Sequence, residues 1–132
     1  MRHQIWGVCL VVAACSRPAA PPVATIQSPE DGWMGSAPVK VTLGATGTTI
    51  AAVADANPAG AHFHLFLNVD PSPEGAPIPA GNPAIIHLGG GQTEFTFDSL
   101  APATYRVIVM LGDNSHVPLA GQRTDTVTFM VH

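Results

Sequence analysis

Residues 61–70 read Ala-His-Phe-His-Leu-Phe-Leu-Asn-Val-Asp, and this stretch decides the fold class. Apolar side chains stand at every second position, namely Phe63, Leu65, Leu67 and Val69. Because successive side chains of a β-strand point to opposite faces, this alternation predicts a strand with one strongly apolar face. The same period places His62 and His64 together on the opposite face.

The alternation recurs on both sides of this stretch. Apolar segments that alternate or are β-branched lie at 39–43, 86–88, 94–98, 105–111 and 126–131, with shorter ones at 25–26 and 48–53. Gly, Pro, Asn and Asp separate these segments, and helix signals are nearly absent. Short strands at this spacing predict an all-β fold, an immunoglobulin-like antiparallel β-sandwich of about seven strands.

The apolar positions of these segments predict the core of the sandwich. We expect it to contain Phe63, Leu65, Leu67, Phe95, Phe97, Tyr105, Val107, Val109, Val127 and Phe129. Residues 70–84 carry prolines at positions 71, 73, 77, 79 and 83. Since proline lacks the backbone donor that a strand needs, this segment is predicted to be a long loop.

The first residues of the chain indicate export. A mostly apolar run at 5–14 follows Arg2, and it is too short to span a bilayer as a permanent helix. It ends in Val12-Ala13-Ala14-Cys15, which resembles a lipobox, where a peptidase cuts before a lipid-bearing cysteine. We therefore interpret residues 1–14 as a lipoprotein signal peptide.

On this interpretation Cys15 carries the lipid and anchors the protein in a membrane. Residues 15–24 then hold the lipidated cysteine and a proline-rich, semi-rigid tether, and residues 25–132 form the folded domain. The expected location is the cell envelope, with the anchor in the outer membrane and the domain facing the periplasm.

Composition and motifs exclude several classes of function. The chain has nine acidic and five basic residues and a net charge of −4 at pH 7, so it lacks the excess of positive charge that nucleic-acid-binding proteins carry. It contains no Gly-x-Ser-x-Gly, no phosphate-binding loop and no His-Glu-x-x-His. We therefore expect a protein that is not an enzyme.

Four histidines are the candidate metal ligands. His62 and His64 share one face of a predicted strand, so their imidazoles can converge on one ion. His87 and His116 stand at a strand end or in a loop, where functional residues concentrate. Zinc and copper both accept neutral imidazole nitrogen. The competing interpretation is that these histidines are exposed, or hydrogen-bond loops to the sheet.

Three polar residues are candidates for orienting the imidazoles from a second layer. Gln92 and Glu94 share one strand face just after three glycines, and Asp113 follows the strand at 105–111. Each could accept a hydrogen bond from the N–H of an imidazole nitrogen that is not a ligand. The alternatives are a solvated hairpin for Gln92 and Glu94, and a turn closed by Asp113.

These segments together resemble the domain of unknown function 4399 (DUF4399) family, found in exported bacterial proteins. The matching stretches are SPEDG at 28–32, AHFHLFLNVD at 61–70, APIPAGNPAIIHLGGGQTEFTFDSLAPATYRVIVMLGDNSHVPL at 76–119 and TDTVTFMV at 124–131. The resemblance covers nearly the whole predicted domain and supports both its fold and the grouping of the four histidines. It implies no activity.

The chain departs from the family pattern at two places. Ala103-Thr104-Tyr105 stands where the family tends to have a His-Thr-Leu sequence, and Leu119 stands where a second histidine often follows His-x-Pro. If either family histidine is a ligand, metal binding here is weaker or different.

Two main hypotheses for function follow, and a third, a metalloenzyme with an open coordination position, ranks below both. The first is an envelope-anchored lipoprotein whose His-rich domain binds a transition metal, with copper ahead of zinc. The alternative is a non-metal interaction module of the envelope, whose polar face or loops bind a protein or a glycan. The fold cannot choose between them, because a β-sandwich hosts many functions.

Overall fold

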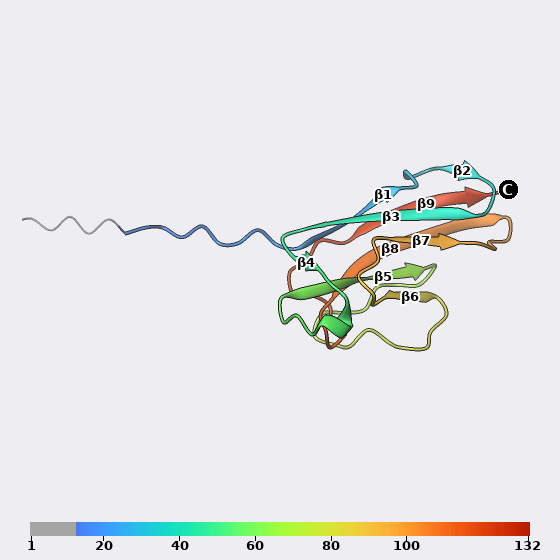
Figure 1. Cartoon of the computed structure of the whole chain (residues 1–132). Helices are drawn as coiled ribbons and strands as arrows, with labels where there is room; N and C mark the ends of the chain where they lie inside the picture. The colour runs from blue at the N-terminus through green and yellow to red at the C-terminus, as the bar shows by residue number, and fades with distance from the viewer. Residues whose placement is uncertain (1–12) are drawn as a thin grey trace, which may run out of the picture.

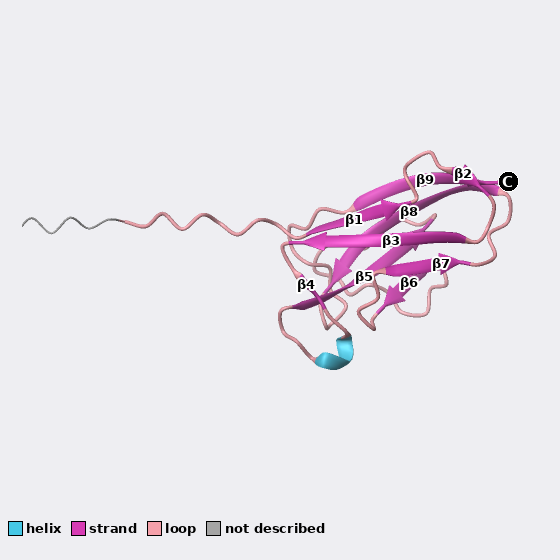
Figure 2. Cartoon of the chain, turned by 45° about the horizontal axis from the view of Figure 1, so that its top comes forward, coloured by secondary structure: helices cyan, strands magenta, loops and turns pink. Residues whose placement is uncertain are grey.

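The computed structural model describes residues 13–132 and contains nine strands in that range. They are β1 (Val23–Ser28), β2 (Met34–Gly35), β3 (Val39–Thr46), β4 (Thr49–Ile50), β5 (Gly60–Leu67), β6 (Ile85–Leu88), β7 (Glu94–Phe97), β8 (Ala103–Gly112) and β9 (Asp125–Val131) (Figure 1). The helical element of the described residues is one short 3-10 turn, η1 (Val53–Asp55), at the edge of the strands (Figure 2).

The strands form two sheets. One has the order β1-β3-β7; the other has the order β2-β9-β8-β5-β4, and β6 pairs with β5. Most pairs are antiparallel, whereas β2–β9 and β4–β5 are parallel. The predicted all-β sandwich is confirmed. The strand number exceeds the predicted seven: β4 lies within the short segment predicted at 48–53, whereas β2 has only two residues and is too short for any alternation to show.

The predicted core lies between the two sheets. Phe63, Leu65, Val107, Val109 and Phe129 are fully or almost fully buried, and Leu67, Phe95 and Tyr105 pack against them partly buried. The three-stranded sheet contributes Val39, Val41 and Leu43 from the other side. The Tyr105 hydroxyl donates a hydrogen bond of 2.7 Å to the carbonyl of Ala101. This contact matches the tyrosine corner of immunoglobulin-like sandwiches.

A second, smaller core covers the outer face of the six-stranded sheet. It consists of Phe66 from β5, Ile108 and Met110 from β8, and Ile78 from the proline-rich loop 70–84; we call these four residues the outer core. The loop contains no strand, as predicted, and it packs against the sheet. Strand β5 is therefore buried on both faces, including the face that carries His62 and His64.

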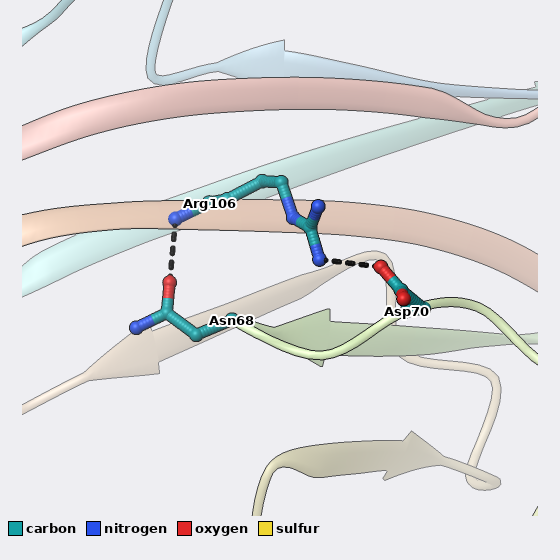
Figure 3. A network of polar contacts seen from close by, with 3 residues as sticks. All are labelled: Asn68, Asp70 and Arg106. Carbon is teal, nitrogen blue, oxygen red and sulfur yellow. Dashed lines mark hydrogen bonds and ion pairs between the residues drawn. The ribbon is translucent and has the colours of Figure 1, made fainter.

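Strand β5 ends earlier than the sequence pattern predicts. It stops at Leu67, because Asn68 adopts a left-handed backbone conformation with φ of 57°. The expectation that Val69 shares the face of Phe63 is therefore wrong, and Val69 packs against the outer core. Asn68 Oδ1 accepts a 2.8 Å hydrogen bond from the Arg106 backbone N–H, and the Arg106 guanidinium pairs with Asp70 at 2.9 Å (Figure 3).

The described residues before β1 extend away from the sandwich (Figure 1). Residues 13–21 are exposed, as is Cys15, and they form no helix or strand. Most of the predicted signal peptide 1–14 lies outside the described residues. Val23 and Ala24, predicted to end the tether, belong to β1, and the Ala24 N–H donates to the Arg123 carbonyl at 2.9 Å. None of the helices in the described range is long and apolar enough to cross a membrane.

Candidate metal centre

Strand β5 places two histidines next to each other on its outer face. In the antiparallel ladder with β8, His62 is opposite Gly112 and His64 is opposite Met110. On the other side of β5, His64 is opposite His87 of β6. The predicted sharing of a face is confirmed, since the rings of His62 and His64 have centroids 4.7 Å apart. The ladder thus delivers three imidazoles to one place.

The fourth histidine comes from a turn that Asp113 builds. Asp113 Oδ1 accepts hydrogen bonds from the backbone N–H groups of Ser115 at 2.8 Å and Val117 at 3.0 Å. The Asp113 carbonyl accepts a third from the His116 N–H at 2.8 Å, and His116 has a φ of 61°. This turn follows β8 directly and points the imidazole of His116 back toward β5. His116 Nε2 lies 3.1 Å from His87 Nε2.

All four imidazoles fall within one coordination sphere. Taking one ring nitrogen from each of His62, His64, His87 and His116, these atoms lie within 4.8 Å of one another. The largest separation between any two ring centroids is the 5.9 Å between His64 and His116. Such a group could hold a metal ion, because nitrogens that converge at this spacing can share one cation.

Two of the imidazoles are buried without hydrogen-bond partners. His62 is 0% exposed and His64 is 2% exposed. Among the described residues, no partner exists for either ring nitrogen of His62 or for Nδ1 of His64. A buried polar atom without a partner costs about 1–3 kcal/mol. The interpretation of these two as exposed strand histidines, or as hydrogen-bonded ones, is therefore wrong.

The environment favours the neutral form of the imidazoles of His62, His64 and His87. Burial is the main cause that lowers the pKa of His62 to about 4, and His87 and His116 lower it further, while Asp113 raises it slightly. Burial and the other three histidines lower the pKa of His64 to about 3. Burial and His116 also lower the pKa of His87. Neutral imidazole is the form that binds metal ions, so the lowered pKa values of these three histidines favour the binding form at pH 7.

Two glycines leave space for the rings. A Cβ atom on Gly112 would lie 2.9 Å from His64 Cε1, and one on Gly89 would lie 2.6 Å from His87 Nε2. Real Cβ atoms essentially never approach another heavy atom so closely, and so any other residue would push the imidazole away. Sequence reasoning assigned no role to Gly112. No sequence signal marks it, because its position opposite His62 is set by the register of β5 against β8.

The three predicted orienting residues lie in different places. Glu94 is on β7 in the other sheet, where it pairs with Lys40 at 2.8 Å. Gln92 Oε1 accepts a 2.7 Å hydrogen bond from the backbone N–H of Gly90. The structure thus gives Gln92 and Glu94 partners other than imidazoles. Asp113 lies at the cluster: it builds the turn of His116, and its charge acts on His62.

A pocket of about 500 Å³ opens beside the cluster. His64, His87 and His116 line it together with Ser115, Ile85 and loop residues 77–81. The Ile78 N–H donates a 2.7 Å hydrogen bond to the carbonyl of His116, which ties the loop to the turn. Sequence reasoning predicted the loop 70–84 but not that it would form a wall of this site.

Fold and site together define a β-sandwich protein with a four-histidine cluster that could hold a metal ion. The model of the domain of unknown function (DUF4399) family matches residues 41–132, and the chain belongs to that family. The match contains all four histidines and begins within β3. No curated protein and no solved structure matches the chain.

Proposed function

We propose that the protein binds one transition-metal ion through His62, His64, His87 and His116. The observation that carries the proposal is the set of three buried imidazole nitrogens without partners, located inside the cluster. A bound ion would give each of these two rings one partner and so reduce the cost of the unpaired nitrogens, with one nitrogen of His62 left without a partner. The hydrogen bond between His87 Nε2 and His116 Nε2 joins the other two imidazoles and leaves both buried rings without one.

Copper is proposed ahead of zinc. Imidazole suits both metals, but a given set of nitrogen ligands binds Cu(II) more tightly than Zn(II) in the Irving–Williams order. The pocket beside three of the imidazoles argues against a closed structural zinc site. Met110 lies across from His64 but packs into the outer core, so the proposed ligands are all imidazoles. The proposed roles are metal carriage or buffering, or stabilisation of the domain, without catalysis.

Metal titration of the purified, detergent-solubilised protein tests the proposal. After metal removal, Cu(II), Cu(I) and Zn(II) are each added, and bound metal is measured after equilibrium dialysis. We expect one equivalent of metal to bind, with Cu(II) held more tightly than Zn(II). The variant His62→Ala/His64→Ala should lose this binding, because it removes both buried ligands.

A control variant and a fold check make the result decisive. His132→Ala removes a histidine outside the cluster and should bind metal like the wild type. Circular dichroism shows whether the double variant retains its sheets. A wild type that binds nothing at micromolar metal, or a folded double variant that binds equally well, would overturn the metal site. The non-metal interaction module would then take its place.

We further propose that Cys15 anchors the domain to a membrane by its lipid, in the outer membrane and facing the periplasm. The support is the lipobox-like Val12-Ala13-Ala14-Cys15 and the exposed segment that follows it. Ser16, not Asp, follows Cys15, and this favours delivery to the outer membrane. Cys15→Ala should move the protein from the membrane to the soluble fraction. Membrane attachment of that variant, together with a wild type that lacks acyl mass, would contradict the anchor.

A further inference from the structure

The pocket beside the histidine cluster is far larger than a metal ion needs. Its volume is about 500 Å³, whereas a water molecule takes up about 30 Å³ in the liquid. Cavities of about 300–1,000 Å³ are the size that small organic ligands occupy. An ion with its bound waters would therefore leave most of this space unfilled.

The wall of the pocket has a polar and an apolar part. The polar part consists of His64, His87, His116 and the hydroxyl of Ser115. The apolar part consists of Ile85 and the loop segment 77–81, which reads Pro-Ile-Pro-Ala-Gly. Among the described residues that line the pocket, none is Asp, Glu, Lys or Arg. The protein thus offers no ion-pair partner to a charged ligand at this wall.

The four histidines are not equivalent with respect to the pocket. His62 is fully buried and is not among the lining residues, whereas the other three are. An ion bound between them would thus have His62 on its buried side and would face the pocket on the other. A metal site in which the protein leaves one side accessible can accept an additional ligand, unlike a closed structural site.

We propose that the metal ion keeps one coordination position open toward the pocket, and that this position takes a small ligand with a nitrogen donor and an apolar body. The inference rests on the metal site proposed above. The donor nitrogen would bind the metal, and the apolar body would pack against Ile85 and the segment 77–81. Binding is reversible coordination, and no bond of the ligand breaks.

Two probes that differ only in their apolar body test this inference. The full protein, loaded with one equivalent of Cu(II), is titrated with imidazole and with 4-phenylimidazole. Electron paramagnetic resonance measures the change in the copper spectrum, and ultrafiltration checks that copper stays with the protein. We expect both probes to change the spectrum, with 4-phenylimidazole binding at least about tenfold more tightly, because the proline-rich wall removes its phenyl ring from water.

Two matched variants locate the effect. Ala80→Trp places a large side chain at the exposed rim of the pocket and should abolish the preference for 4-phenylimidazole. Ala120→Trp adds the same side chain at an exposed position outside the pocket lining and should retain the preference.

The possible failures of the two proposals can be told apart. Three results would overturn the proposal of a pocket ligand and leave the proposed metal site intact. In these, the copper-loaded protein binds neither probe, binds both equally tightly, or releases its copper to them. Protein that binds no copper in the direct titration would overturn both proposals. If Ala80→Trp prefers 4-phenylimidazole over imidazole as strongly as the wild type does, the proposal of a pocket ligand is overturned as well.

Discussion

At the scale of single residues, the site depends on two glycines as much as on the four histidines. The imidazole of His87 lies over Gly89, and that of His64 lies against Gly112. Neither glycine has a positive φ, so the backbone conformation does not require glycine at these positions. The lack of a Cβ is what matters, because it creates the space into which the rings turn.

Gly89→Ala should therefore weaken metal binding although it changes no ligand. Its new Cβ would collide with the His87 ring and force the imidazole away from the cluster. We expect an affinity loss of about tenfold or more, similar to that caused by changing a residue that orients a ligand. Equilibrium dialysis measures it.

Gly90→Ala, one position along, is the control for this substitution. Its Cβ would meet only the end of the Gln92 side chain, so metal affinity should stay close to the wild-type value. Equal affinities for Gly89→Ala and the wild type would contradict the importance of this space.

The two buried histidines also predict a dependence of stability on pH. The pKa values of His62 and His64 are lowered from 6.5 to about 4 and about 3, so unfolding takes up protons below pH 6.5. The metal-free domain should have its full stability from these groups above pH 6.5. This stability should fall as pH drops toward 4, by at most about 1.4 kcal/mol per pH unit for each group.

Urea unfolding of the metal-free protein between pH 7 and 5 measures this loss, in a range where most carboxylates stay ionised. His62→Phe/His64→Phe replaces both imidazoles by rings that do not titrate, and should show a clearly smaller slope. If the free energy of unfolding changes with pH by the same amount in both proteins, the buried histidines do not contribute to that change.

At the scale of elements, the end of β5 decides where the proline-rich loop goes. The left-handed Asn68 ends the alternation after Leu67, so the chain turns toward the outer face and Val69 joins the outer core. The Asn68 N–H also donates to the Arg106 carbonyl at 2.8 Å, which fixes this turn to β8. The loop that follows then covers the histidine face of the sheet.

Asn68→Ala should destabilise the domain by about 1–3 kcal/mol. It removes the hydrogen bond from the Arg106 N–H to Asn68 Oδ1, and it puts alanine in a left-handed conformation that favours asparagine or glycine (Figure 3). Chemical denaturation measures the loss. Asp70→Ala removes only an ion pair whose carboxylate is 88% exposed, and should cost less than about 1 kcal/mol. Equal costs would contradict the role given to Asn68.

At the scale of the whole molecule, the site lies at the end of the sandwich from which the N-terminal segment leaves (Figure 1). Thr49 and Ile50 of β4 pair with Gly60 and Ala61 at the start of β5, just before His62. The N-terminal segment leaves from this end, and the C-terminus lies at the other (Figure 1). The four histidines come from β5, β6 and the turn after β8, so unfolding would separate His87 and His116 from each other and from the pair in β5.

Metal should therefore stabilise the whole fold. Leu65→Ala truncates a fully buried side chain and should lower the free energy of unfolding by about 2–5 kcal/mol. Free metal at 100 times its Kd should restore about 2.7 kcal/mol, and a chelator should remove that gain. Thermal unfolding with and without metal measures both effects. The variant His62→Ala/His64→Ala should show no metal-dependent shift, and an equal shift there would contradict binding at the cluster.

The local pattern by itself determined the strands, most of the sandwich core and the shared face of His62 and His64. These follow from the period of two, which depends only on neighbouring residues. The partner of each strand and its register depend on contacts between distant segments. Tertiary structure alone thus decided that His87 lies opposite His64, that His116 turns back to meet them, and that Glu94 pairs with Lys40 in the other sheet. It also folded the loop 70–84 over the histidine face, which buried two imidazoles and formed the pocket.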